Sequence, residues 1–350
     1  MKENPFTLSF GRTASQVIER DLDLQTVFDD FDSEPPRNTT YIITGPRGCG
    51  KTVALSHIID VYRGKKDWVV ARLSLSNNIL EQMASTLYEN GNAKFHFLKA
   101  EFSFSFQGIS FSVKGDNPVS SVHAYISKLL AFYKRKGIRV LVAIDDVAKN
   151  DSMVDFIRAY QGFLIDHQDV MLLLTGLYKN ISKLETDRSL TFLFRAPKLL
   201  LSPLSIYAIS SSYANVFGVD EKRAIELAKL TKGYAFAYQV LGDILYRNKK
   251  NNVDDTVLKE YDRKLMEWSY DIIWSELTER EKDILTMLAE GNSSNISLMN
   301  ELKISKGNLA IFKKRLIQEG IINSEKRGEI QFSLPRFEQF VLFQKLLASD

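Results

Sequence analysis

Residues 40–52 read Thr-Tyr-Ile-Ile-Thr-Gly-Pro-Arg-Gly-Cys-Gly-Lys-Thr. The second part, Gly45 to Thr52, matches the complete pattern G-x-x-x-x-G-K-[ST]. The apolar, β-branched residues in front of it predict a buried strand, and Val53 to Ile59 behind it predict a helix. A loop between strand and helix can turn successive amide groups towards an anion, and the helix N-terminus adds its dipole. The stretch therefore predicts an α/β fold with a phosphate-binding loop.

The motif gives chemistry to its individual residues. Lys51 is expected to reach the β- and γ-phosphates, and the Thr52 hydroxyl to ligate Mg²⁺. Cys49 is the only cysteine, which excludes an intrachain disulfide and fits a reducing, cytoplasmic setting. The candidate nucleotide-binding residues here are Gly45, Pro46, Arg47, Gly48, Cys49, Gly50, Lys51, Thr52 and Val53.

A second acidic element follows a long apolar run. Ile138 to Ile144 reads as a buried strand and ends in Asp145-Asp146. Carboxylates at the carboxyl end of a strand in an open α/β sheet face the ligand crevice. We expect Asp145 to hold Mg²⁺ and Asp146 to orient an attacking water. The alternative is a polar strand end at the surface.

The rest of the chain divides by pattern. As far as residue 202, strands alternate with helices, which predicts a parallel sheet covered on both faces. Phenylalanines spaced mostly by two in residues 95–113 predict an inserted β-hairpin, whose Phe-rich face packs on the core or meets a partner. Residues 203–275 show only helical patterns. In residues 276–350, Thr278 and Glu281 form a capping box, and three helices followed by two short strands predict a winged helix-turn-helix.

The chain resembles the AAA+/STAND P-loop ATPases, specifically the archaeal-type ATPases related to origin-recognition initiators. Besides residues 45–52, the resemblance is carried by residues 17–24, 175–176, 194–205 and 231–239. It implies a P-loop ATPase core at residues 1–202, a helical lid at 203–275, and ATP or ADP with Mg²⁺ as cofactors. It also implies site residues outside the loop: Ile18 and Arg20 near the adenine, Thr175 as sensor 1, Arg195 as an arginine finger, and Gly233, Tyr234 and Gln239 closing over the base.

Two departures from the family pattern bear on activity. Asp146 stands where the family usually has Glu and is one methylene shorter, which predicts slow hydrolysis. Ala235 stands where the lid motif usually has Pro, and no Arg follows Gly233 within this motif. Arg195 serves as a finger, in cis or towards a neighbouring copy, or pairs with an acidic residue; the sequence leaves these open.

The winged region carries a basic stretch. Its candidate DNA-contacting residues are Lys306, Asn308, Lys313, Lys314, Lys326 and Arg327. The alternative is that this basic helix is solvated and the domain packs within the chain, where it inhibits the ATPase. Net charge +3 does not decide between them.

Two functions therefore stay open. The first is a slow Mg-dependent ATPase that couples nucleotide state to domain rearrangement and to DNA or protein partners, including a second copy. The second is a nucleotide-locked signalling switch with negligible hydrolysis. The apolar runs are too short to span a bilayer, so we expect no membrane partner.

Overall fold

The structure is a computed structural model that describes residues 4–6, 18, 20–90, 102–106, 109–113, 121–324 and 328–349. These residues form two compact units. Unit 1 is made of described residues within 1–19, 45–50 and 201–350, and unit 2 of those within 20–44 and 51–200. Most of the phosphate loop thus packs with unit 1, whereas the strand before it and the helix after it belong to unit 2. The predicted domain boundaries after residues 202 and 275 stay predictions.

Unit 2 is built on a parallel five-stranded sheet, which confirms the predicted α/β architecture. Its strands are β1 (Thr40–Thr44), β2 (Trp68–Leu73), β5 (Arg139–Ile144), β6 (Val170–Gly176) and β7 (Lys198–Leu200). The sheet order is β2-β5-β6-β1-β7, so β6 lies between the strand that leads into the phosphate loop and the strand that ends before Asp145. Because all strands run parallel, their carboxyl ends meet at one edge of the sheet.

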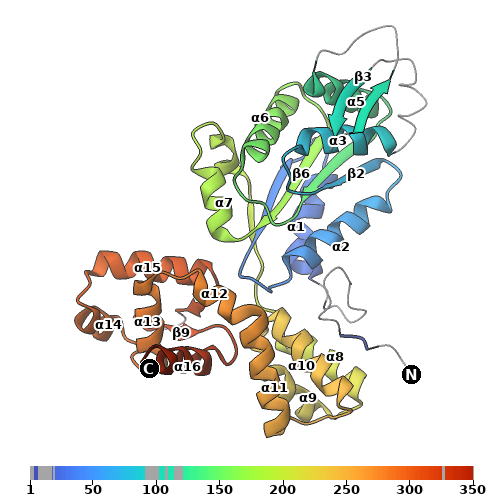
Figure 1. Cartoon of the computed structure of the whole chain (residues 1–350). Helices are drawn as coiled ribbons and strands as arrows, with labels where there is room; N and C mark the ends of the chain where they lie inside the picture. The colour runs from blue at the N-terminus through green and yellow to red at the C-terminus, as the bar shows by residue number, and fades with distance from the viewer. Residues whose placement is uncertain are drawn as a thin grey trace. The chain divides into compact units, whose positions relative to one another are not determined.

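Helices cover both faces of this sheet (Figure 1). They are α1 (Asp21–Asp32), α2 (Lys51–Arg63), α3 (Ile79–Glu89), α5 (Val122–Arg135), α6 (Asp151–Ile165) and α7 (Tyr178–Glu185), followed by the 3-10 helix η1 (Thr191–Arg195). Strand residues alternate between the faces, as the pleat requires. Ile42 shares a core with α3, α5 and α6. Its neighbour Tyr41 packs edge-on against Phe31 of α1, and Phe31 in turn contacts Tyr62 of α2.

The Phe-rich stretch contains an antiparallel strand pair. β3 (Phe102–Phe106) pairs with β4 (Ile109–Val113), with Phe102 opposite Val113 and Phe106 opposite Ile109. Residues 95–101 and 107–108 of the predicted hairpin lie outside the described residues.

The first part of unit 1 after the sheet is helical. Its elements are α8 (Ile206–Phe217), α9 (Glu221–Lys229), α10 (Ala235–Arg247), α11 (Asp255–Leu265), the π-helix η2 (Met266–Tyr270) and α12 (Asp271–Ser275). Short polar side chains cap α8, α9 and α11; at α9, for example, the Asp220 carboxylate accepts from the Arg223 amide. We call residues 203–275 the lid.

The C-terminal part of unit 1 starts at the predicted capping box. The Thr278 side chain accepts from the Glu281 amide, and the Glu281 side chain accepts from the Thr278 amide. The elements that follow are α13 (Glu279–Ala289), α14 (Asn295–Leu302), α15 (Lys306–Gln318), β8 (Ile322–Asn323), β9 (Gln331–Phe332) and α16 (Phe337–Ser349). β8 and β9 are antiparallel. Lid and C-terminal part share one continuous hydrophobic core and belong to the same compact unit.

Among the described residues, none of the helices combines the length and the apolar character that a membrane span requires.

Candidate functional site

The phosphate loop joins β1 to α2 and has the backbone that its glycines permit. Gly48 and Gly50 have φ angles of 75° and 97°, in the left-handed region that disfavours other residues. Gly48 is also required for space, because a Cβ there would come within 2.4 Å of the Tyr234 hydroxyl. The position of Gly48 in the motif thus reflects both backbone conformation and a close neighbour from the lid.

Lid residues hold two carbonyl groups of the loop. The Tyr234 hydroxyl donates to the carbonyl oxygen of Arg47 over 2.7 Å and lies 2.8 Å from Ser269 Oγ, which therefore donates to it. Burial raises the pKa of Tyr234 above its usual value, so the hydroxyl keeps its proton. The Phe236 amide donates to the carbonyl oxygen of Gly48 over 3.0 Å. This bond satisfies an amide that the N-terminus of α10 would otherwise leave without an intrahelical partner.

Two buried polar atoms beside the loop have no hydrogen-bond partner among the described residues. They are Oγ1 of Thr44 and Nε of Arg47. Buried polar groups are rarely left in this state, so both atoms are available to a ligand or a water molecule.

Asp145, Asp146 and Thr175 come together at the carboxyl ends of β5 and β6. The Thr175 hydroxyl, which is fully buried, donates to Oδ1 of Asp145. The Asp146 amide lies 3.1 Å from the same Oδ1 and 3.0 Å from Thr175 Oγ1. Asp146 itself has a φ of 50° and is exposed. A non-glycine residue in this conformation is uncommon, and such residues cluster at functional sites.

Arg72 is a member of this cluster that the sequence reasoning missed. It is the penultimate residue of β2, and its Nη2 lies 4.0 Å from Oδ2 of Asp145. That oxygen accepts no hydrogen bond from the described residues, and the two side chains are 42% and 25% exposed. A cation or a phosphate can therefore approach them. The available signal was a lone charged residue in an otherwise apolar strand next to β5.

The remaining predicted residues of unit 2 lie at separate places. Lys51 and Thr52 form the first turn of α2, where Lys51 is half-buried and Thr52 and Val53 are exposed. Arg20, directly before α1, donates to Asp23 over 3.1 Å. Arg195 ends η1 and is exposed, and its side chain forms no hydrogen bond or ion pair with another described residue. The alternative that Arg195 pairs with an acidic residue thus finds no partner in this part of the chain.

In unit 1, three predicted base-proximal residues belong to the lid core or its rim. Ile18 packs against the hydrophobic core of the unit. Gly233 is buried, with its carbonyl oxygen accepting from the Leu204 amide over 2.8 Å. Gln239 is a half-buried residue of α10.

The basic residues of α15 do not form one equivalent set. Lys306, Asn308 and Lys314 are exposed. Lys313 donates to Asn295 Oδ1 over 2.7 Å, and burial lowers its pKa. The neighbouring Arg315 pairs with the buried Glu281 at 3.2 Å. Predicted residues Lys326 and Arg327 lie outside the described residues.

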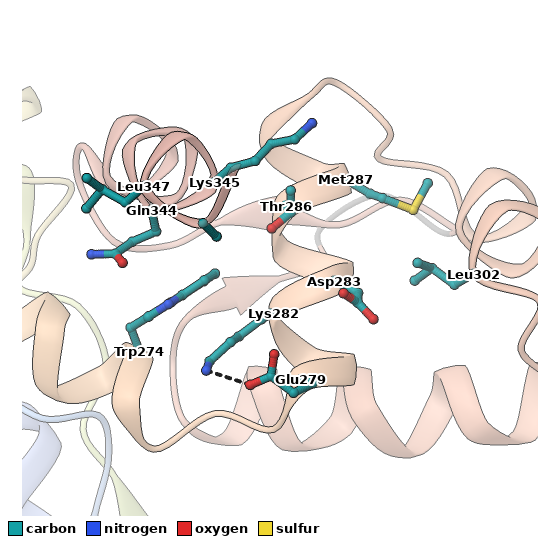
Figure 2. Close-up of a pocket in the computed structure, with 11 residues that line it drawn as sticks. Trp274, Glu279, Lys282, Asp283, Thr286, Met287, Leu302, Gln344, Lys345 and Leu347 are labelled. Atoms are coloured by element: carbon teal, nitrogen blue, oxygen red, sulfur yellow. Dashed lines mark hydrogen bonds and ion pairs between the residues drawn. The ribbon is translucent and has the colours of Figure 1, made fainter. Parts of the chain in front are cut away.

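The C-terminal part contains a cavity of about 540 Å³ (Figure 2). Trp274, α13 and the end of α16 contribute to its walls. Lys282 and Glu279, which also line it, form an ion pair with a distance of 2.7 Å. None of the predicted site residues lines it.

A parallel sheet with a complete phosphate-binding loop after β1 and paired aspartates after β5 defines the class of P-loop ATPases. The chain belongs to the family described as "ATPase domain predominantly from Archaea", whose pattern matches residues 18–194, about half of the chain. Residues 268–341 match a second family, described as a domain of unknown function. No curated protein sequence matches the chain significantly.

Solved structures share the fold at low sequence identity. The Walker-type ATPase PABY2304 of Pyrococcus abyssi superposes with a TM-score of 0.65 at 14% identity, covering 96% of this chain and 99% of that one. Cdc6p from Pyrobaculum aerophilum superposes with a TM-score of 0.51 at 15% sequence identity, covering 97% of each chain. The ORC2 protein of Aeropyrum pernix, in ADPNP and ADP complexes, superposes with a TM-score of 0.51 at 11% sequence identity. The match covers 93% of this chain and 92% of that one. These likenesses confirm the predicted α/β fold, a parallel sheet flanked by helices as in P-loop ATPases.

Proposed function

We propose that this protein binds Mg-ATP and hydrolyses it slowly, and that the nucleotide state controls the arrangement of its lid and C-terminal part. The observation that carries the proposal is the cluster of Asp145, Asp146 and Thr175 at the carboxyl ends of β5 and β6. In an open α/β sheet this edge is the ligand crevice.

The phosphates would bind at the loop. The amides of Gly45 to Gly50 provide donors, and Lys51 provides the countercharge for the β- and γ-phosphates. The unpartnered Arg47 Nε supports a ligand at this place. The ADPNP and ADP complexes of the structurally similar ORC2 protein support a nucleotide as that ligand.

Mg²⁺ would be held by Thr52 and Asp145. Both supply hard oxygen ligands, and Mg²⁺ usually takes one or two protein ligands beside phosphate oxygens and waters. Oδ2 of Asp145 fits this role because it accepts no hydrogen bond from the described residues, while Oδ1 is fixed by Thr175. The ion would neutralise charge on the transferring phosphoryl group. Arg72, at 4.0 Å, would move from Asp145 towards the phosphates once the carboxylate binds the ion.

Hydrolysis would depend on Asp146. Its exposed carboxylate follows Asp145 and would orient the attacking water, while Thr175 holds the backbone of this turn. The shorter Asp in place of the usual Glu supports a slow rate. The exposed Arg195 would stabilise the developing charge, either in cis or in a second copy of the chain.

The base would lie near Ile18, Arg20, Gly233, Tyr234 and Gln239. This part of the proposal rests on the family resemblance. Tyr234 and Phe236 bind carbonyl groups of the loop, so a shift of the loop on nucleotide binding would be passed to α10. A reducing, cytoplasmic setting is also part of the proposal, supported by the presence of a single cysteine, Cys49, in the sequence.

The C-terminal part would act as a winged helix that contacts duplex DNA. Lys306, Asn308 and Lys314 are the exposed residues of α15 that support this, since cations on such a helix meet phosphates and an amide can reach a base edge.

A specific contact favours the second candidate, a nucleotide-locked switch. Gly320, after α15, lies directly on Pro46 of the loop, because a Cβ on Gly320 would come within 2.5 Å of the Pro46 ring. Lys232 of the lid donates to the carbonyl oxygen of Phe332 over 3.0 Å. These contacts support a C-terminal part that stabilises one nucleotide state instead of binding DNA.

Steady-state ATP turnover, measured with and without duplex DNA at low salt, separates the two candidates. Slow turnover that duplex DNA changes supports the first. Tight nucleotide binding with no measurable turnover and no effect of DNA supports the second. Absence of nucleotide binding would overturn both.

A further inference from the structure

The N-terminal residues Asn4-Pro5-Phe6 occupy a socket in the lid. Phe6 is only 2% exposed, and its ring lies 5.5 to 6.0 Å from the ring centroids of Tyr213, Phe217 and Tyr238. These side chains come from α8 and α10. A segment far away in the sequence thus supplies one aromatic ring to an aromatic cluster that is otherwise made by the lid alone.

Space for the Phe6 ring depends on a glycine within a helix. Gly242 belongs to α10, and a Cβ there would come within 2.4 to 2.6 Å of three atoms of the Phe6 ring. Glycine in the interior of a helix is less favourable than alanine. Its presence at this position is explained by the close approach of the ring.

Asn4 orients the segment in two ways. Its Oδ1 accepts from the Phe6 amide at 3.1 Å, which closes an Asx turn over Pro5. Its Nδ2 donates to Oδ1 of Asp243 at 3.0 Å. The turn therefore presents one polar group and one ring on the same side, and both meet neighbouring residues of α10.

Hydrogen bonds among the lid residues themselves also fix the side chains of the socket. The Tyr213 hydroxyl donates to the carbonyl oxygen of Tyr238 over 2.8 Å, and the Tyr238 hydroxyl pairs with Ser212 at 2.6 Å. Asp243 accepts from Arg247 at 3.0 Å and Lys264 at 2.9 Å. Burial alone would raise the pKa of the Asp243 carboxyl, but hydrogen bonds from Arg247 and Lys264 hold it below its usual value. The acid is thus ionised and already oriented to accept from Asn4.

We propose that this socket is a peptide-recognition site whose ligand is the chain's own Asn-Pro-Phe turn, and that the turn is a releasable strap on the lid. A preformed pocket with one anchor ring and one placed polar group is the usual form of a peptide-binding site.

One helix links the strap to the phosphate loop. The N-terminal end of α10 meets the loop through Tyr234 and Phe236, and Gly242 and Asp243 lie further along the same helix. Release of the strap would free α10 to follow the loop. This regulatory part rests on the proposed function, whereas recognition of the turn does not.

Binding in trans tests the recognition. The receptor is the chain without residues 1–6, and the probe is a synthetic peptide of residues 1–10 with a C-terminal fluorophore. We expect saturable binding by fluorescence anisotropy, and much weaker binding to the intact chain, since its own segment competes at high effective concentration. A Phe6→Ala peptide should bind on the order of tenfold to a hundredfold more weakly. A truncated chain that unfolds cooperatively but does not bind the peptide overturns the proposal.

Gly242→Ala is the matched receptor control. It removes no atom and favours the helix, so the truncated chain should stay folded but should lose the peptide. Undiminished binding would overturn the proposal. In the full chain, Gly242→Ala and Phe6→Ala should be strongly non-additive in unfolding experiments, because each alone empties or blocks the same contact. Additive effects would also overturn the proposal. Because this experiment uses the full chain, it does not require the truncated chain to fold.

Release of a fluorescent ADP analogue tests the regulation. Phe6→Ala should accelerate release on the order of fivefold or more, and the wild-type peptide added in trans should reverse this. Unchanged release would overturn the regulatory part. If the intact chain binds no nucleotide, the proposed function fails, and the peptide experiments still decide whether the socket recognises the turn.

Discussion

The carboxyl end of β5 and the exposed side of α15 were both predicted as sites, but they differ in how their residues are arranged. Asp145, Asp146 and Thr175 form one hydrogen-bonded cluster. On α15, Lys306 and Lys314 are exposed, whereas Lys313 is bound to Asn295.

The difference has a physical cause. The register of parallel strands fixes which residues meet at the edge of a sheet, so adjacent strand ends form a cluster wherever the strands are identified. A helix surface has no such constraint, because its available side chains depend on which neighbouring helices cover it. Chemistry at the sheet edge is therefore more predictable than chemistry on the helix.

The largest expected effect tests the sheet edge. Asp146→Asn should lower ATP turnover on the order of 10²-fold or more and leave Mg-ATP affinity unchanged, because it removes the group that orients the water. Turnover and calorimetry measure the two effects. Asp155→Asn, an exposed acid of α6 paired with Arg158, is the matched control. Unchanged turnover in Asp146→Asn would remove this residue from the catalytic cluster.

Asp145→Asn should distinguish the metal-binding role of Asp145 from the water-orienting role of Asp146. We expect Mg-ATP affinity to fall about tenfold to a hundredfold, since the metal loses a charged ligand, while affinity in the presence of a chelator stays the same. Asn keeps an acceptor for Thr175, so the cluster should stay folded. An equal loss with and without Mg²⁺ would contradict the metal assignment.

On α15, the expected effects are smaller and differ between lysines. If the helix binds DNA, the double variant Lys306→Glu, Lys314→Glu should weaken duplex binding. The slope of log affinity against log salt concentration should fall in magnitude by about 2. Lys313→Gln should change DNA affinity less, because its side chain is already bound to Asn295. Gel shifts at several salt concentrations measure both.

The opposite outcome on α15 is equally informative. If substitutions of Lys313 and Lys314 lowered DNA affinity equally, the burial of Lys313 would not prevent it from contacting DNA. No DNA binding at low salt in either nucleotide state, with raised basal turnover in the double variant, would favour the locked switch.

The smallest expected effect concerns the lid. Tyr234→Phe should lower the free energy of unfolding by about 1 kcal/mol, because the Arg47 carbonyl and Ser269 each lose a hydrogen-bond partner. Tyr207→Phe is the matched control, since that side chain is 75% exposed and should not matter. Urea unfolding compares the two. Equal stability of both variants would show that the loop contact is not stabilising.

Local patterns predicted the fold well where they carry strong chemistry. The loop motif, the apolar run before Asp145 and the capping box at Thr278 each led to the correct element. Contacts between distant residues were not predictable in this way. The lone charge in the strand around Arg72 does not show that it lies beside Asp145, and no local pattern places Phe6 against Gly242. Each contact depends on which strand or helix lies next to the residue.

The central claim is a nucleotide site at the phosphate loop, and titration of Mg-ATP into the chain by calorimetry tests it most directly. The account predicts saturable binding to the wild-type chain and to Lys65→Ala, whose side chain pairs with Asp32 on the surface of unit 2. It predicts binding weakened about tenfold to a hundredfold in Lys51→Ala, which loses the countercharge to the phosphates. Equal affinity of Lys51→Ala and wild type, or no binding to either, would contradict the account.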